Sequence, residues 1–215
     1  MKKIIFAILP LKGGLEKRKY PVDGNSLIES DKPIYYAVNP AIASNLKKDD
    51  EVKVFLIKTK GGENAGEENA RKFEEELNEF NTVGASIKCE TIETAFDPSK
   101  TNYKPLFKNL INNLEQDCEI YADVTYGPKP LAFLVLSAIQ FAEKFFDATV
   151  GNIVYSKVEF IREKGADGKE YQKIKDGSEM IYDITPLYLI NSFINVLDAV
   201  PGEKAIKSID VLFEE

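Results

Sequence analysis

The chain has 215 residues, of which 44% are hydrophobic and 29% are charged, the composition of a globular protein with a sizeable core. It contains no histidine, so it cannot supply a Ser-His-Asp or Cys-His catalytic arrangement, an H-E-x-x-H zinc site or a histidine-based ribonuclease centre. The formal net charge of −7 argues against non-specific binding to a DNA or RNA backbone.

The cysteines and the apolar runs indicate in which cellular compartment the protein is expected. Cys89 and Cys118 are the only cysteines and form no C-x-x-C pair, so we expect reduced thiols and neither a disulfide scaffold nor a zinc ribbon. The apolar run at the amino terminus ends at Pro10, too early for a signal peptide, and Leu131–Phe146 carries too many polar residues to span a bilayer. We therefore expect a cytoplasmic protein with no membrane contact, no metal and no cofactor.

The first 150 residues alternate between strand and helix patterns. Four apolar segments are expected to be strands: Lys3–Leu9, Val52–Ile57, Ala85–Ile92 and Cys118–Val124. Four segments have helical periodicity: part of Tyr35–Leu46, then Glu67–Phe80, Tyr103–Leu114 and Leu131–Phe146. Residues 15–33 are expected to be irregular, and loops are expected at Gly61-Gly62, Gly66 and Asp97-Pro98. This order predicts a Rossmann-like α/β fold, a mainly parallel sheet with helices on both faces.

The last third is expected to add a hairpin and a helix. Val150–Ile161 and Tyr171–Ile184 alternate as strands around a turn at Ala166-Asp167-Gly168, and Thr185-Pro186 opens a helix through Ala199 that Pro201-Gly202 stops. We expect a single domain over 1–215, with a core at 1–150, the hairpin and closing helix at 151–200 and a tail at 201–215.

Charge is distributed unevenly near the amino terminus. Residues 1–20 carry six cations against Glu16 alone, and residues 61–80 carry seven glutamates against Arg71 and Lys72. We interpret the acidic stretch as a solvated helix face, whereas the basic start is carried by a strand toward a loop. Glu51-Val52-Lys53 matches the E-x-K part of a metal-dependent nuclease, but a solvated charged turn beside Asp49 and Asp50 accounts for it better.

Two loops at expected carboxyl ends of strands suit an anionic ligand, because ligands of open α/β sheets bind there. In Pro10-Leu11-Lys12-Gly13-Gly14, glycines allow close backbone approach and Lys12 adds a charge, although a plain turn explains the glycines equally well. In Asp123-Val124-Thr125-Tyr126-Gly127-Pro128-Lys129, a hydroxyl, a bare backbone N–H and a cation meet at the start of a helix. The alternative is that Thr125 only caps the helix and Lys129 is solvated.

The run Asp123-x-Thr125-x-Gly127-x-Lys129, followed by a long apolar helix, resembles the signature of the CRISPR-associated Rossmann fold (CARF) family. The segments Ile153-Val154-Tyr155, Ile181–Pro186 and Asp50–Lys60 are also similar to that family. The resemblance implies a homodimer that binds a cyclic oligoadenylate, tetra- or hexa-adenylate, in a shared groove, as a sensor of type III CRISPR antiviral defence. It implies these ligand-binding residues: Pro10, Leu11, Lys12, Gly13, Thr59, Lys60, Thr125, Tyr126, Gly127, Pro128 and Lys129.

Three functions remain open at this level. The chain is a binding module that senses the oligoadenylate, a ring nuclease that opens it, or a regulator with an unrelated small ligand. In a ring nuclease, a ribose 2′-hydroxyl attacks the adjacent phosphate to leave a 2′,3′-cyclic phosphate, Lys129 is the catalytic charge stabiliser, and Lys12 and Thr125 assist. Tyr126 either contacts an adenine or packs at the dimer seam. No effector nuclease is expected in the chain, which is either complete or the sensor part of a longer protein.

Overall fold

A computed structural model of the chain describes residues 1–60, 65–95, 99–164, 169–196, 202 and 204. It divides into two compact units, Met1–Thr185 and Pro186–Glu215, and the expected single domain stays a prediction. Among the described residues, no helix combines the length and the apolar character that crossing a membrane requires.

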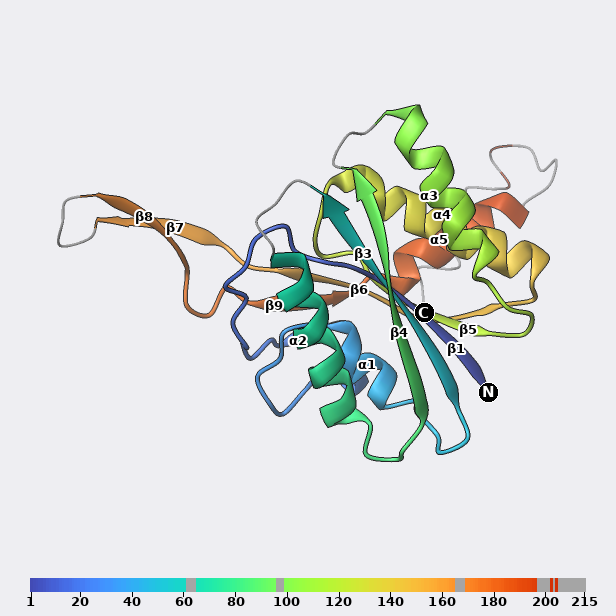
Figure 1. Cartoon of the computed structure of the whole chain (residues 1–215), viewed down its shortest axis with the longest axis horizontal. Helices are drawn as coiled ribbons and strands as arrows, with labels where there is room; N and C mark the ends of the chain where they lie inside the picture. Colours follow the sequence, from blue (N-terminus) through green and yellow to red (C-terminus); the bar gives the residue numbers. More distant parts are fainter. Residues whose placement is uncertain (61–64, 96–98, 165–168, 197–201, 203, 205–215) are drawn as a thin grey trace. The chain divides into compact units, whose positions relative to one another are not determined.

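The first unit is built on a seven-stranded, mostly parallel sheet in the order β2-β9-β6-β5-β1-β3-β4 (Figure 1). Its strands are β1 Lys2–Ile8, β2 Val22–Asp23, β3 Glu51–Lys60, β4 Ser86–Ala95, β5 Glu119–Asp123, β6 Thr149–Lys157 and β9 Met180–Asp183. The pairs β1–β3, β3–β4, β1–β5, β5–β6 and β2–β9 are parallel, and in this sheet only β6–β9 is antiparallel. This arrangement confirms the predicted Rossmann-like fold.

Helices cover both faces of the sheet, α1 and α2 on one side and α3 and α4 on the other (Figure 1). The helices are α1 Val38–Ala43, α2 Ala65–Phe80, α3 Lys100–Asn112, α4 Lys129–Phe145 and α5 Thr185–Val196, with a short 3₁₀ turn at Ser26–Ile28. All but α1 lie close to their predicted bounds. α1 is shorter than the expected helical segment, and Pro40 lies within its first turn, where the missing N–H costs little.

The central strand β1 is apolar over most of its length because both of its faces are covered. Ile5 and Ala7 lie in the buried cluster that also contains Phe73 of α2. Phe6 points to the opposite face and packs against Phe55 of β3, with ring centroids 5.8 Å apart. A strand buried on both sides has no polar alternation, which is why this segment was recognisable from its sequence.

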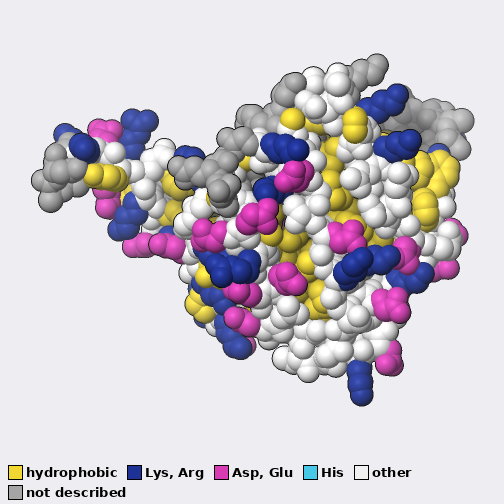
Figure 2. All heavy atoms as spheres, in the orientation of Figure 1, with side chains coloured by type: hydrophobic (Ala, Val, Ile, Leu, Met, Phe, Trp, Pro, Cys, Tyr) yellow, Lys and Arg dark blue, Asp and Glu magenta, His cyan; other side chains and the backbone are white. Residues whose placement is uncertain are grey.

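The predicted hairpin exists, but each of its strands is interrupted. β6 ends at Lys157, and the chain continues as β7 Phe160–Lys164, which pairs antiparallel with β8 Glu170–Ile174 in a separate two-stranded sheet. In this β7–β8 ribbon only Ile174 is even partly covered, and charged and apolar side chains are mixed along it (Figure 2). An alternating pattern indicates two distinct faces, but nothing in it says whether a core covers one of them.

One expectation about charge was wrong, and a second holds for every described glutamate of α2 except Glu76. Asp50, expected in a solvated turn, is 2% exposed and pairs with the Met1 ammonium at 3.0 Å and with buried Lys3 at 3.8 Å. On α2, Glu76 is buried, although the other acidic and basic side chains are interspersed over the helix surface (Figure 2). Strand pairing and helix packing bring these groups into contact with partners far away in the sequence.

Several predicted features lie outside the described residues. These are the loop at Gly61-Gly62, the loop start at Asp97-Pro98, the turn at Ala166-Asp167-Gly168, Pro201 and the tail from residue 205.

Candidate functional site

The sheet has a topological switch point between β1 and β5. From β1 the chain moves outward to β3 and β4, and it then crosses back to β5 on the other side of β1. The loops that follow β1 and β5 therefore leave the sheet from neighbouring strands, and ligands of such sheets bind between loops of this kind. Both loops singled out from the sequence lie here, with Thr59 and Lys60 at the end of the adjacent strand β3.

The loop after β1 presents a row of free backbone donors. Within the described chain, the N–H groups of residues 11–14 make no hydrogen bond. Gly14 has a φ of +77°, in the left-handed region that favours glycine. Consecutive free N–H groups beside such a residue form a concavity that suits an anion, and the exposed side chain of Lys12 adds a positive charge.

The loop after β5 requires glycine at position 127. Its φ is +78°, and a Cβ atom there would lie 2.6 Å from Cγ2 of Ile8 at the end of β1. The loop therefore packs directly onto the end of β1. The N–H groups of Tyr126, Gly127 and Lys129 make no hydrogen bond within the described chain, while Pro128 and Pro130 have no N–H to offer.

Lys129 is the first residue of α4, and its side chain is exposed. The helix dipole disfavours a cation at the amino terminus of a helix. The cation and the dipole together, however, attract an anion. Lys60, by contrast, is paired with Glu93 at 3.0 Å. Of these two cations, only Lys129 offers a charge that no described carboxylate compensates.

The hydroxyl of Thr125 holds the loop to the neighbouring strand. It accepts hydrogen bonds from the Ser156 backbone N–H at 2.8 Å and the Ser156 hydroxyl at 3.2 Å, while the Thr125 N–H donates to Asp123 Oδ1 at 3.0 Å. Burial raises the pKa of Asp123, and the hydrogen bonds from Thr125 oppose that rise. Thr125 thus anchors the loop to β6.

Tyr126 is partly buried and packs against the core, where its ring contacts Tyr36 edge-on at 6.1 Å between centroids. Burial raises the pKa of its hydroxyl. Thr59 is 8% exposed, and its hydroxyl has no hydrogen-bond partner among the described residues. A buried hydroxyl without a hydrogen-bond partner is rare, because it destabilises the folded state. A polar ligand that hydrogen-bonds to Thr59 at the end of β3 would remove this destabilisation.

The sequence reasoning missed the polar residues that support these loops. Asn69 and Glu76 lie on the buried face of α2, and Ser156 of β6 donates to the hydroxyl of Thr125. A signal was present for the first two, because they flank Phe73 at helical spacing on the stripe that faces the core. A second Asp-x-Thr turn, Asp183 and Thr185, also holds β6, since the Thr185 hydroxyl accepts from the Ile153 N–H at 2.8 Å.

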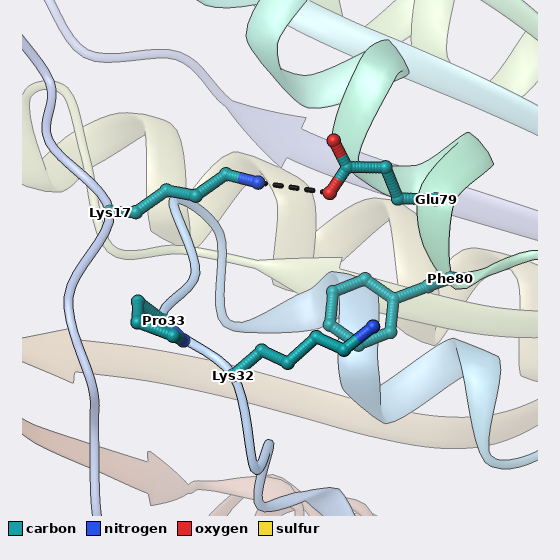
Figure 3. Close-up of a pocket in the computed structure, with 5 residues that line it drawn as sticks. All are labelled: Lys17, Lys32, Pro33, Glu79 and Phe80. Carbon is teal, nitrogen blue, oxygen red and sulfur yellow. Dashed lines mark hydrogen bonds and ion pairs between the residues drawn. The ribbon is translucent and has the colours of Figure 1, made fainter.

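A separate cavity of about 450 Å³ lies at the carboxyl end of α2 (Figure 3). It is lined by Lys17, Lys32, Pro33, Glu79 and Phe80. Lys17 donates to Glu79 at 2.9 Å, and this hydrogen bond raises the pKa of Lys17. The basic amino-terminal residues therefore do not form one patch: Lys17 pairs here, and Lys2 pairs with Glu115 at 2.6 Å.

The described residues contain no group of three or more His, Cys, Asp or Glu side chains placed to hold a metal ion.

Comparison with known proteins gives one informative relative. No protein-family model matches the chain. The chain is similar to a protein named CRISPR-associated protein MJ1674 from Methanocaldococcus jannaschii, with 29% identity over 156 residues. The match covers 66% of this chain but only 24% of the relative, so the chain spans about a quarter of the length of that protein. The sequence resemblance and this relative both point to proteins associated with CRISPR systems.

Proposed function

We propose that the chain binds a cyclic oligoadenylate and acts as a sensor in a CRISPR-associated antiviral system. The observation that carries this proposal is the set of free backbone N–H groups in the two switch-point loops, residues 11–14 and Tyr126, Gly127 and Lys129. Lys12 and Lys129 add a positive charge to each loop. Such a site suits a ligand with several phosphates, and the name of the relative supports the CRISPR context.

A ligand with rotational symmetry favours two copies of the site. A cyclic oligoadenylate repeats its phosphates around a ring, so two protomers related by a two-fold axis offer it equivalent donors. Phe133 lies one turn after Lys129 on α4 and is 72% exposed, an apolar contribution to a surface beside the loops. We therefore propose that the protein dimerises with the two loop pairs facing each other.

Dimerisation is tested by light scattering. At micromolar concentration we expect about twice the 24.1 kDa of the chain, and Phe133→Glu is expected to shift the mass toward one chain because it places charge on an apolar interface. Phe160→Glu, on the exposed β7–β8 ribbon, is the matched control. A wild-type protein whose mass equals that of one chain at these concentrations contradicts the proposed dimer.

Ligand binding is tested by titration with cyclic tetra-adenylate and cyclic hexa-adenylate, followed by chromatography of the ligand. We expect saturable binding of one of the two rings, stronger at low salt because phosphate contacts release counterions. A linear oligoadenylate of the same length is the control. Absence of binding to either ring overturns the proposal and leaves the unrelated small ligand as the function to pursue.

The same chromatography separates sensing from ring opening. Recovery of the intact ring supports a sensor, whereas a linear product ending in a 2′,3′-cyclic phosphate assigns a ring nuclease. In that case the ring's own 2′-hydroxyl is the nucleophile, and a 2′-deoxy ring remains uncut. The protein has no histidine, so the rate is not expected to fall with a histidine titration near pH 6.5.

A further inference from the structure

The loop after β1 is held by α2 through its carbonyl groups. The side-chain amide of Asn69 donates to the carbonyl oxygens of Pro10 at 3.0 Å and Lys12 at 3.1 Å, and Lys72 Nζ donates to Leu15 O at 2.9 Å. Asn69 is fully buried, whereas Pro10 is partly buried and Lys12 is exposed. α2 thus binds carbonyls of this loop, while the N–H groups of residues 11–14 have no partner in the described chain.

Tyr36 connects Asn69 to the second loop. Its hydroxyl donates to the backbone carbonyl of Asn69 at 2.9 Å, and its ring packs edge-on against Tyr126. The backbone N–H of Tyr36 donates to Glu76 at 3.0 Å, which fixes Tyr36 to the same helix. Asn69 and Tyr36, both buried, and the partly buried Tyr126 thus form a continuous connection between the loop after β1 and the loop after β5, which we name the loop bracket.

We propose that Asn69 is the positioning residue of the anion site, and that the loop bracket sets the spacing between its two rows of N–H donors. This inference rests on the proposed function for the identity of the ligand. Its physical basis is that an asparagine with two short bonds to one loop orients that loop's carbonyls, and therefore its N–H groups, before a ligand arrives. Binding then costs less conformational entropy, because the loop is already ordered.

Asn69→Asp tests the proposal because it keeps the size of the side chain but replaces a donor by an acceptor. The carboxylate repels the carbonyls of Pro10 and Lys12, so the loop after β1 is released. Asn78→Asp, an exposed position on the same helix, is the matched control for the added charge. Tyr36→Phe removes only the hydroxyl that donates to Asn69 and is the second variant, in case Asn69→Asp does not fold.

Two measurements are made on each variant. Backbone ¹⁵N relaxation without ligand is expected to give lower order parameters for the N–H groups of residues 11–14 in both Asn69→Asp and Tyr36→Phe, and also for those of Tyr126, Gly127 and Lys129 if the bracket links the loops. Affinity for cyclic tetra-adenylate is expected to fall about tenfold in Asn69→Asp. The slope of log affinity against log salt is expected to become shallower by about 0.7 for each phosphate that the variant no longer binds, which a purely structural residue would not cause.

Unchanged order parameters in residues 11–14 in both variants overturn the positioning role. Lower order parameters in residues 11–14 without a change at Tyr126, Gly127 and Lys129 overturn the bracket but keep Asn69 as the support of the first loop. A wild-type protein that binds no cyclic oligoadenylate refutes the proposed function instead, and the relaxation measurements still decide the role of Asn69 because they need no ligand.

Discussion

Replacing Lys129 with alanine is expected to lower the affinity for cyclic tetra-adenylate by about ten- to a hundredfold. A charge-assisted hydrogen bond to a phosphate contributes about 1.5–3 kcal/mol, and the dipole of α4 and the free N–H groups of Gly127 and Lys129 act on the same anion. Lys12→Ala is expected to have a smaller effect, because Lys12 lies on a loop rather than at the start of a helix. Calorimetric titration measures both.

Lys144→Ala is the control for this substitution, because Lys144 lies in the last turn of the same helix and is exposed. It removes the same charge from the protein without touching the loops. Equal affinities for the wild-type protein and Lys129→Ala would refute the assignment of the site, whereas equal losses for Lys129→Ala and Lys144→Ala would show that net charge alone matters.

Replacing Gly127 with alanine is expected to destabilise the protein by about 2–4 kcal/mol. Alanine is strained at the positive φ of this position. Its Cβ atom would also lie 2.6 Å from Cγ2 of Ile8, a fully buried residue that cannot move away freely. Urea denaturation monitored by circular dichroism measures the free energy of unfolding.

Gly84→Ala is the matched control for the backbone. Gly84 has a φ of +76°, but a Cβ atom there has nothing within 4 Å, so we expect a loss of only about 1 kcal/mol. The difference between the two variants isolates the contact with Ile8. Ile8→Ala removes that contact, so the double variant Gly127→Ala/Ile8→Ala should lose less than the sum of the single losses, and strict additivity would contradict the packing argument.

The fold could be predicted from the sequence because each central strand has a recognisable local pattern. A parallel strand buried on both faces, such as β1 or β5, is a nearly unbroken apolar run, and a helix between two such runs predicts a crossover. The two loops at the switch point were also predictable, since they directly follow β1 and β5. Their glycines and lysines are local features that need no partner to be recognised.

Residues with polar side chains on the core side of a helix were harder to interpret. On the sequence, Asn69 and Glu76 look like members of a charged, solvated helix, although both lie on the stripe that contains Phe73. Whether such a residue is solvated or buried depends on what packs against its face, and for Asn69 that is a loop 57 positions away in the sequence. Thr125 is a similar case, because its sequence neighbours do not reveal that Ser156 of β6 binds its hydroxyl.

The sequence by itself determined the strand and helix order, the Rossmann-like class and the two loops, because these depend on local periodicity and on residues with special backbone freedom. Only the tertiary structure decided which polar groups have hydrogen-bond partners within the chain and which remain free. Asn69 and Lys72 donate hydrogen bonds to carbonyls of the loop after β1, and Ser156 donates to the hydroxyl of Thr125. In the described chain, the N–H groups of residues 11–14 have no hydrogen-bond partner. Hydrogen bonds between distant segments depend on distances that the crossovers of the sheet create, and no local pattern in the chain records them.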